Sequence, residues 1–178
     1  LVFEPVSSGH HMALYLRLFA RAAKREGWKI TLITNPDALA HPAFDLVRRE
    51  GADIETLLTE NISRPDQDGS LHLLRAQYIH FSAVRNALDS LKSGARPDVA
   101  LVLNLSHFDK IAALFGSPFG DIPWMGILVS AKFHRHSLGI GPKSRNDLVF
   151  KYLFARMLQI STLRCVGVID EVFFAHAN

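Results

Sequence analysis

The stretch LVFEPVSSGHHM, residues 1–12, decides how this 178-residue chain folds. A short apolar run ends at Glu4-Pro5, a loop of small residues follows, and the apolar residues beyond the loop recur at helical spacing. A strand, a tight loop and a helix in this order open a parallel α/β sheet. The first loop of such a sheet borders the crevice in which ligands bind. We therefore expect this loop to form one wall of a functional site.

The composition is that of a globular protein. Hydrophobic residues make up 48% of the chain and charged residues 21%, which is enough for a domain with a real core. No apolar run reaches the roughly 18 residues that span a bilayer. The first residues lack the basic start and cleavage site of a signal peptide. The single Cys165 excludes an internal disulfide and fits a reducing compartment, so we expect a cytoplasmic location.

Apolar and β-branched runs alternate with helical patterns along the rest of the chain. Further strands are expected at 29–34, 52–58, 99–103, 122–130 and 164–169, the strand at 52–58 near an edge. Helices are expected at 12–26, 70–92, 108–115 and 148–160, with one irregular helix between Pro36 and Gly51. The alternation predicts a doubly wound, mostly parallel α/β sheet of about six strands with helices on both faces, in the order 3-2-1-4-5-6.

Two helices carry further signals. Gly27 is expected to end the first helix as its C-terminal cap. The helix at 70–92 has the strongest periodicity, and its predicted buried stripe consists of Leu74, Tyr78, Phe81, Val84, Leu88 and Leu91. The chain begins without methionine, directly in a strand, and ends just past one. We therefore expect a portion of a longer protein, folded as one domain over residues 1–178.

Three loops that carry histidine are expected to converge at one edge of this sheet. Between strands one and four the chain reverses direction, so the loops that leave these strands face each other across a crevice. These loops are residues 7–11 and 104–107. The loop after strand five, residues 131–136, lies beside them. The predicted site is therefore built from segments far apart in the sequence.

The first loop offers an anion site with structural alternatives. Gly9 either lets a ligand approach the backbone or simply permits the turn. His10 and His11 are candidates for a base or for phosphate contacts, or one faces solvent and the other caps the loop. The N-terminus of the following helix offers free N–H groups and partial positive charge, which suit an anion. Glu4 is either functional or structurally paired, and the structural role is favoured.

The loops after strands four and five supply the remaining candidates. His107 and His134 are each either a catalytic group or a structural histidine, and their shared location raises the weight of the functional role. Asn104 and Ser106 follow an apolar strand. They either bind ligand hydroxyls or cap the helix that begins near Phe108.

Basic residues dominate the later part of the chain. From Ile122 to Ile169 the sequence holds one acid, Asp147, against seven lysines and arginines. Four of the seven lie in a loop expected at 132–146: Lys132, Arg135, Lys143 and Arg145. Such a loop suits a phosphorylated acceptor or an anionic membrane surface. The alternative is a solvated face without a partner.

Several function classes lack their signatures. No G-x-G-x-x-G follows the first strand and no carboxylate ends the second, which argues against a dinucleotide-binding domain. The P-loop and the G-x-S-x-G elbow are also missing from the sequence. The histidine pairs at 10/11 and 134/136 lack the spacing and neighbouring carboxylates of a zinc site, so we expect no metal. The basic loop lacks interleaved aromatic residues, so we expect no nucleic-acid partner.

The sequence resembles the N-terminal domain of glycosyltransferases of the GT-B fold. The resemblance begins with S-G-H-H at 8–11, the helix LYLRLFARAAKREG at 14–27 and the strand KITLIT at 29–34. It continues in PWMGILVSAKFHRH at 123–136, where these enzymes have a strand that ends in a Phe-His or similar pair. RCVGVIDE at 164–171 is similar to the strand that precedes the crossing to their second domain.

The resemblance implies a divided site. GT-B enzymes have two Rossmann-like domains, of which the C-terminal one binds the nucleotide-sugar and the N-terminal one binds the acceptor. On this basis Gly9 and His10 line the cleft that faces the donor, and His134 lies near the reacting sugar. His107 matches less well, because the spacing after strand four is not the usual one. The donor-binding domain is outside this sequence, so this domain is not expected to transfer sugar alone.

The leading hypothesis is therefore the acceptor-binding domain of a nucleotide-sugar-dependent glycosyltransferase. The nucleotide-sugar is a co-substrate, a glycan or lipid-linked molecule is the acceptor, and no cofactor is expected. Location is cytoplasmic, including peripheral association with the inner face of the membrane. The first alternative is a non-catalytic Rossmann-like subunit that anchors or scaffolds a separate glycosyltransferase. The second is a small-molecule enzyme of flavodoxin-like fold, for which the sequence has no fingerprint.

Overall fold

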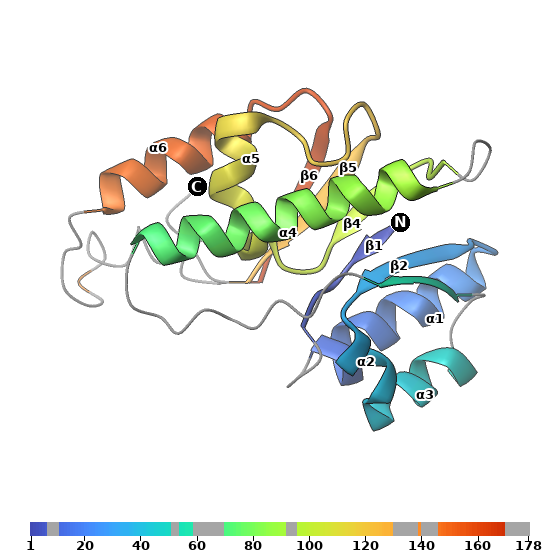
Figure 1. Cartoon of the computed structure of the whole chain (residues 1–178). Coiled ribbons are helices and arrows are strands. Elements are labelled where there is room, and N and C mark those ends of the chain that lie inside the picture. Colours follow the sequence, from blue (N-terminus) through green and yellow to red (C-terminus); the bar gives the residue numbers. More distant parts are fainter. Residues whose placement is uncertain are drawn as a thin grey trace.

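A six-stranded parallel sheet forms the centre of the protein (Figure 1). The computed structural model describes residues 1–6, 11–50, 54–58, 70–91, 96–129, 139 and 146–169. The strands are β1 (Val2–Phe3), β2 (Ile30–Thr34), β3 (Ile54–Leu58), β4 (Ala100–Val102), β5 (Trp124–Leu128) and β6 (Leu163–Val168). Their order is β3-β2-β1-β4-β5-β6 and all neighbours are parallel. This confirms the predicted order, with β3 at one edge.

Helices cover both faces of the sheet, as predicted. On one side lie η1 (His11–Leu16), α1 (Arg17–Arg25), α2 (Pro36–Ala40) and α3 (Pro42–Glu50). On the other lie α4 (Ser70–Ser90), α5 (Asp109–Phe115) and α6 (Asp147–Met157), with the short helix η2 (Leu105–His107) between β4 and α5. Within the described residues, no helix is both long enough and apolar enough to cross a membrane.

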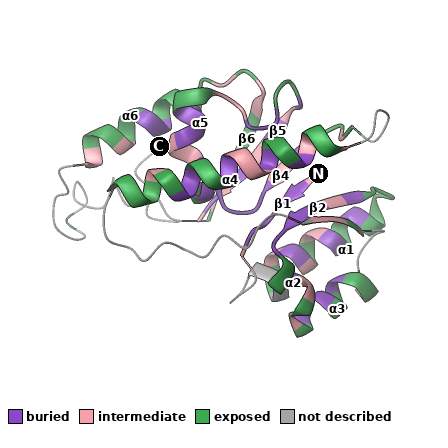
Figure 2. Cartoon of the chain, in the orientation of Figure 1, coloured by how far each residue is buried: buried purple, intermediate pink, exposed green. Residues whose placement is uncertain are grey.

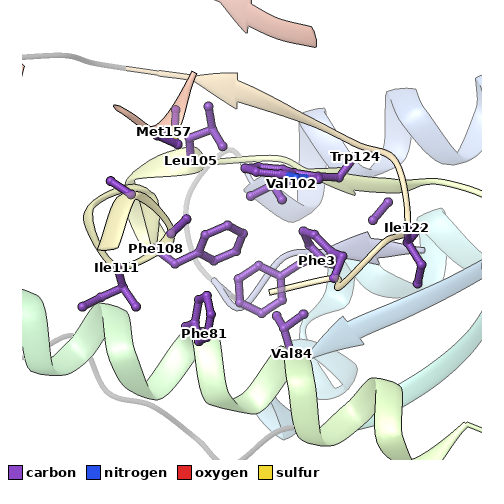
Figure 3. Packing of buried hydrophobic residues seen from close by; sticks show 14 of the residues in the cluster. Phe3, Phe81, Val84, Val102, Leu105, Phe108, Ile111, Ile122, Trp124 and Met157 are labelled. Carbon is purple, nitrogen blue, oxygen red and sulfur yellow. The ribbon is translucent and has the colours of Figure 1, made fainter. Parts of the chain in front are cut away.

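Two hydrophobic cores meet at the central strand β1. Side chains of successive strand residues point to opposite faces. Val2 accordingly packs in the core under α1 and α3, whereas Phe3 packs in the core under α4, α5 and α6. Figure 3 shows Phe3 against Phe81 and Val84 of α4 in this larger core. Neither residue of β1 is more than 1% exposed, so this short strand is fully enclosed (Figure 2).

The end of α1 follows the predicted capping. Gly27 has a positive φ of 70°, a conformation that favours glycine. Its N–H donates to the carbonyl of Lys24, and the N–H of Trp28 donates to the carbonyl of Ala23. These two bonds form a Schellman motif, which satisfies carbonyls left open at the helix end.

Two helix predictions need correction. The irregular helix expected between Pro36 and Gly51 is two helices, α2 and α3, separated at His41. His41 is extended, with ψ of 130°, because the proline ring of Pro42 disfavours helical backbone at the preceding residue. In α4, Tyr78 is 53% exposed, although it was expected in the buried stripe. The buried face of α4 instead includes the polar residues Gln77 and His80. The helix is therefore rotated relative to the orientation that the apolar pattern predicted.

Candidate functional site

Three polar residues gather where β1, β2 and β4 end. Glu4 follows β1, Asn35 follows β2, and Asn104 lies just past β4. All three are buried, with exposures of 0%, 6% and 6%. The carboxyl ends of parallel strands lie at one edge of a sheet, and the edge between β1 and β4 is the point where the strand order reverses. This carboxyl-edge cluster, defined as Glu4, Asn35 and Asn104, is therefore at the location where such folds bind ligands.

Glu4 and Asn35 fix the start of the first loop. The backbone N–H of Glu4 donates to the carbonyl of Ile33 at 3.1 Å, and its Oε1 accepts from the N–H of Val6 at 3.0 Å. The Asn35 side-chain amide donates to the carbonyl of Pro5. Its Oδ1 accepts from the N–H of Ala38 at 2.9 Å, which caps α2. The end of β2 therefore holds the chain where it leaves β1.

Asn104 and Ser106 form the turn after β4. Oδ1 of Asn104 accepts from the backbone N–H of Ser106 at 3.1 Å and from its hydroxyl at 2.8 Å. The first of these bonds caps η2, whereas the capping alternative predicted from the sequence concerned the helix that begins near Phe108. Ser106 is exposed. Within this turn, Asn104 is thus a buried anchor for Ser106, an exposed residue whose hydroxyl donates to it.

His107 lies in a cluster of rings with His80 and Phe3. The His80 and His107 ring centroids are 5.1 Å apart, and both rings meet Phe3 edge-on at 6.0 and 6.3 Å. His80 Nδ1 donates to the carbonyl of His107 at 3.2 Å. Burial lowers the pKa of His80, and the bond to the His107 carbonyl opposes that shift. The structure therefore places His107, 7% exposed, inside the packing between α4 and the sheet.

Gln77 ties α4 to the start of α5. Its Nε2 donates to the carbonyl of Ser106 at 2.8 Å and to Asp109 Oδ1 at 2.6 Å. Its Oε1 accepts from the backbone N–H groups of Lys110 and Ile111 at 3.0 and 3.3 Å. These N–H groups are among those that a helix start leaves without an intrahelical partner. Gln77 of α4 therefore caps the N-terminus of α5, as an N-cap side chain within α5 would.

Gln77 and His80 were not among the residues predicted to form the site. Both occupy the buried face of α4, three residues apart, where an apolar stripe was expected. The available signal was a pair of polar residues at helical spacing within a helix that otherwise buries apolar side chains. Together they position the 104–107 turn, the part of the predicted site that the structure describes.

Other predicted site residues lie outside the described residues. These are Gly9, His10, Lys132, His134, Arg135, Lys143 and Arg145, together with the side chain of His11. Their functional roles stay predictions. The order of the sheet does place β5 beside β4, so the chain leaves β5 next to the turn at Asn104.

A groove of about 400 Å³ lies at the amino ends of β4 and β5, opposite the carboxyl ends that carry the cluster. It is bordered by the end of α4 and by residues 96–97 and 118–122, which precede β4 and β5. Arg96 and Asp121 form an ion pair across its rim. Since these segments enter the strands at their amino ends, the groove is separate from the carboxyl-edge cluster. Among the described residues, no three His, Cys, Asp or Glu side chains lie together as a metal site.

Comparisons with known proteins found similarity in structure and none in sequence. No protein-family model matches the chain, and no curated protein matches it. Among solved structures the chain is similar to CalG4, a calicheamicin glycosyltransferase, with 18% identity and a TM-score of 0.44. The alignment covers 90% of this chain and 43% of that chain, so this chain spans less than half of that protein.

Proposed function

We propose that this chain is the acceptor-binding domain of a nucleotide-sugar-dependent glycosyltransferase of the GT-B type. The observation that supports the proposal is the carboxyl-edge cluster of Glu4, Asn35 and Asn104 at the reversal between β1 and β4. Three buried polar residues hold the chain as it leaves three strands, so the loops beyond them start from fixed positions. The sequence resemblance at 8–11 and 123–136 implies that these loops take part in sugar transfer.

In this proposal, the first loop contacts the donor and the loops after β4 and β5 contact the acceptor. Gly9 and His10 face the phosphates of the donor, which is held mainly by a second domain outside this sequence. The hydroxyl oxygen of the exposed Ser106, whose hydrogen is donated to Asn104, accepts a hydrogen bond from a hydroxyl of the acceptor, a glycan or a lipid-linked sugar. A neutral imidazole of His134 accepts a hydrogen bond from a sugar hydroxyl and orients the acceptor. Such a protein works in the cytoplasm, at the inner face of the membrane where its acceptor is lipid-linked.

The proposal predicts that the 178-residue chain alone has negligible affinity for nucleotide-sugars. Calorimetric titration with UDP-, GDP- and ADP-sugars measures this directly, and the full product of the gene is the matched comparison. We expect the full product to bind one of these donors and to release its nucleoside diphosphate when an acceptor is present. Micromolar binding of a donor by the 178-residue chain would contradict the divided site. A full product without a second nucleotide-binding domain would favour the non-catalytic subunit instead.

A further inference from the structure

The outer face of α6 exposes large apolar side chains. Leu148, Val149 and Tyr152 are 75%, 54% and 64% exposed, whereas Leu153, Phe154 and Met157 on the opposite face are buried. Leu148 and Tyr152 are four residues apart, so they lie on the same side of the helix. In Figures 1 and 2, α6 lies at the margin of the α4–α6 layer with an exposed stripe along its length. Leu148 and Tyr152 therefore form an apolar ridge that points away from the core.

Basic side chains flank this ridge. Lys151 and Arg156 are both exposed, and neither forms an ion pair with another residue in the described part of the chain. The wider sequence from Ile122 to Ile169 has seven basic residues against Asp147 alone. The α6 face, defined as Leu148, Val149, Lys151, Tyr152 and Arg156, is therefore both apolar and positively charged.

Helix α1 on the other side of the sheet is an internal comparison. It also exposes apolar residues, because Leu14 in η1 and Leu18 in α1 are 45% and 54% exposed. The arginines beside them are partly neutralised, since Arg17 and Arg21 contact Glu50 at 2.6 and 3.8 Å. Lys24 and Arg25 at the end of α1 are also exposed, and neither forms an ion pair among the described residues. The two helices therefore differ in that Glu50 neutralises two of the four basic residues of α1, whereas no acid among the described residues pairs with Lys151 or Arg156 of α6.

We propose that the α6 face binds the surface of an anionic lipid bilayer. On an anionic membrane surface, a helix face with apolar residues flanked by lysine and arginine places its apolar side chains at the boundary of headgroups and acyl chains. Leu148 and Tyr152 take that place, and Lys151 and Arg156 contact the anionic headgroups. A nucleic acid would gain nothing from Leu148 or Val149, which favours a bilayer over a phosphate backbone. The binding does not depend on sugar transfer, so its test is independent of the proposed function.

Sedimentation with phospholipid vesicles tests the proposal on the 178-residue chain. We expect binding to vesicles of three parts phosphatidylcholine and one part phosphatidylserine at about 50 mM salt, and its loss at about 500 mM salt. Each basic residue near an anionic surface contributes roughly 1 kcal/mol, so Lys151→Gln with Arg156→Gln should lower the partition coefficient by roughly tenfold or more. Leu148→Ser with Tyr152→Ser should also weaken binding. The matched control, Leu14→Ser with Leu18→Ser on the opposite side of the sheet, should bind as the unchanged protein does.

A probe on the helix tests which face makes contact. In a Cys165→Ser background, a single cysteine introduced as Tyr152→Cys carries a polarity-sensitive fluorophore, and Leu18→Cys is the control position. We expect a blue shift of emission on addition of the anionic vesicles at position 152 and none at position 18. All substituted side chains are exposed, and circular dichroism with thermal melting checks that each variant is folded.

Three results would overturn the proposal. The first is binding that is equal for anionic vesicles and for vesicles of pure phosphatidylcholine. The second is an equal loss of binding in the control with Leu14 and Leu18 changed. The third is absence of vesicle binding by the unchanged protein at low salt. If analytical ultracentrifugation then shows that Tyr152→Ser alters self-association, the α6 face contacts a second copy of the chain instead of a bilayer.

Discussion

His80, which packs against His107 and Phe3, should make the stability of the protein depend on pH. Burial lowers the pKa of His80 below its ordinary value of 6.5, so the folded protein favours the neutral ring. With respect to His80, the folded protein is therefore most stable above about pH 6.5. This stability is lost as the pH falls through the folded pKa, because protons bind more readily to His80 in the unfolded chain. We therefore expect the melting temperature to fall on acidification from pH 7.5 to 5.

Replacement of His80 isolates this effect. His80→Phe keeps an aromatic ring against Phe3 and removes the titrating group, so the pH dependence of melting should flatten even if the variant is less stable overall. His72→Gln, at an exposed position of the same helix, is the control and should keep the dependence of the unchanged protein. Parallel curves for the unchanged protein and His80→Phe would refute the assignment.

His134 and His107 were both predicted to be catalytic, and a pair of variants separates their roles. His134→Ala in the complete enzyme should lower turnover by roughly one to three orders of magnitude with little change in melting temperature. His107→Ala should lower the melting temperature, because a buried ring against Phe3 and His80 is lost at a cost of about 1–3 kcal/mol. Turnover and melting are measured for both. An unchanged rate for His134→Ala, or a rate lost together with folding, would return His134 to a structural role.

At this scale the sequence predicted that the loops after β1 and β4 leave the sheet side by side, but it did not predict which residues hold those loops in place. Asn104 was recognised as either a ligand contact or a cap, and its side-chain oxygen is in a capping bond. Gln77 and His80 were missed because their partners, the carbonyls of Ser106 and His107, lie on a distant segment. A linear pattern does not show which backbone group a polar side chain will meet.

Among the elements, η2 depends on a glycine in its neighbour β5. A β-carbon added at Gly126 would overlap the side chain of Leu105, which is fully buried in η2. Gly126→Ala should therefore destabilise the protein by about 1–3 kcal/mol through overpacking. Leu105→Ala alone should cost about 2–5 kcal/mol. Because the second change relieves the overlap made by the first, the double variant should cost less than the sum, as measured by urea denaturation.

The control for this pair is Gly167→Ala in β6. A β-carbon there meets only Ile127 Cγ1 at 3.9 Å and the carbonyl oxygen of Gly126 at 4.0 Å, which are ordinary contacts. Its effect on the free energy of unfolding should stay below about 1 kcal/mol. Strict additivity of Gly126→Ala and Leu105→Ala would show that the two residues do not oppose each other.

Element types were more predictable than element ends. The strands at Ile30–Thr34 and Trp124–Leu128 fall inside the predicted runs, because β-branched and apolar residues cluster there. The break between α2 and α3 was missed, although His41-Pro42 carries the signal for it. In α4 the apolar period left the rotation of the helix uncertain, since several of its apolar residues remain exposed.

For the whole molecule, the alternation of strands and helices was sufficient to predict the order of the sheet. Parallel neighbours need crossover connections, and the length of the segment between β3 and β4 suits the crossing to the other side of β1. The ligand was not predictable in the same way. Its contacts depend on loops whose composition allows many conformations, and the resemblance to GT-B enzymes rests on short segments.

The position of β1 has a consequence for the order in which the chain assembles. Val2 pairs with Leu32 on one side and with Leu101 on the other, so one neighbour is near in sequence and the other is remote. Local pairing precedes remote pairing because closing the longer loop costs more entropy. We therefore expect β1, β2 and β3 to associate first, which leaves the second edge of β1 unpaired until Ala100–Val102 arrives. An open strand edge is a template for other chains, so aggregation competes with folding during this interval.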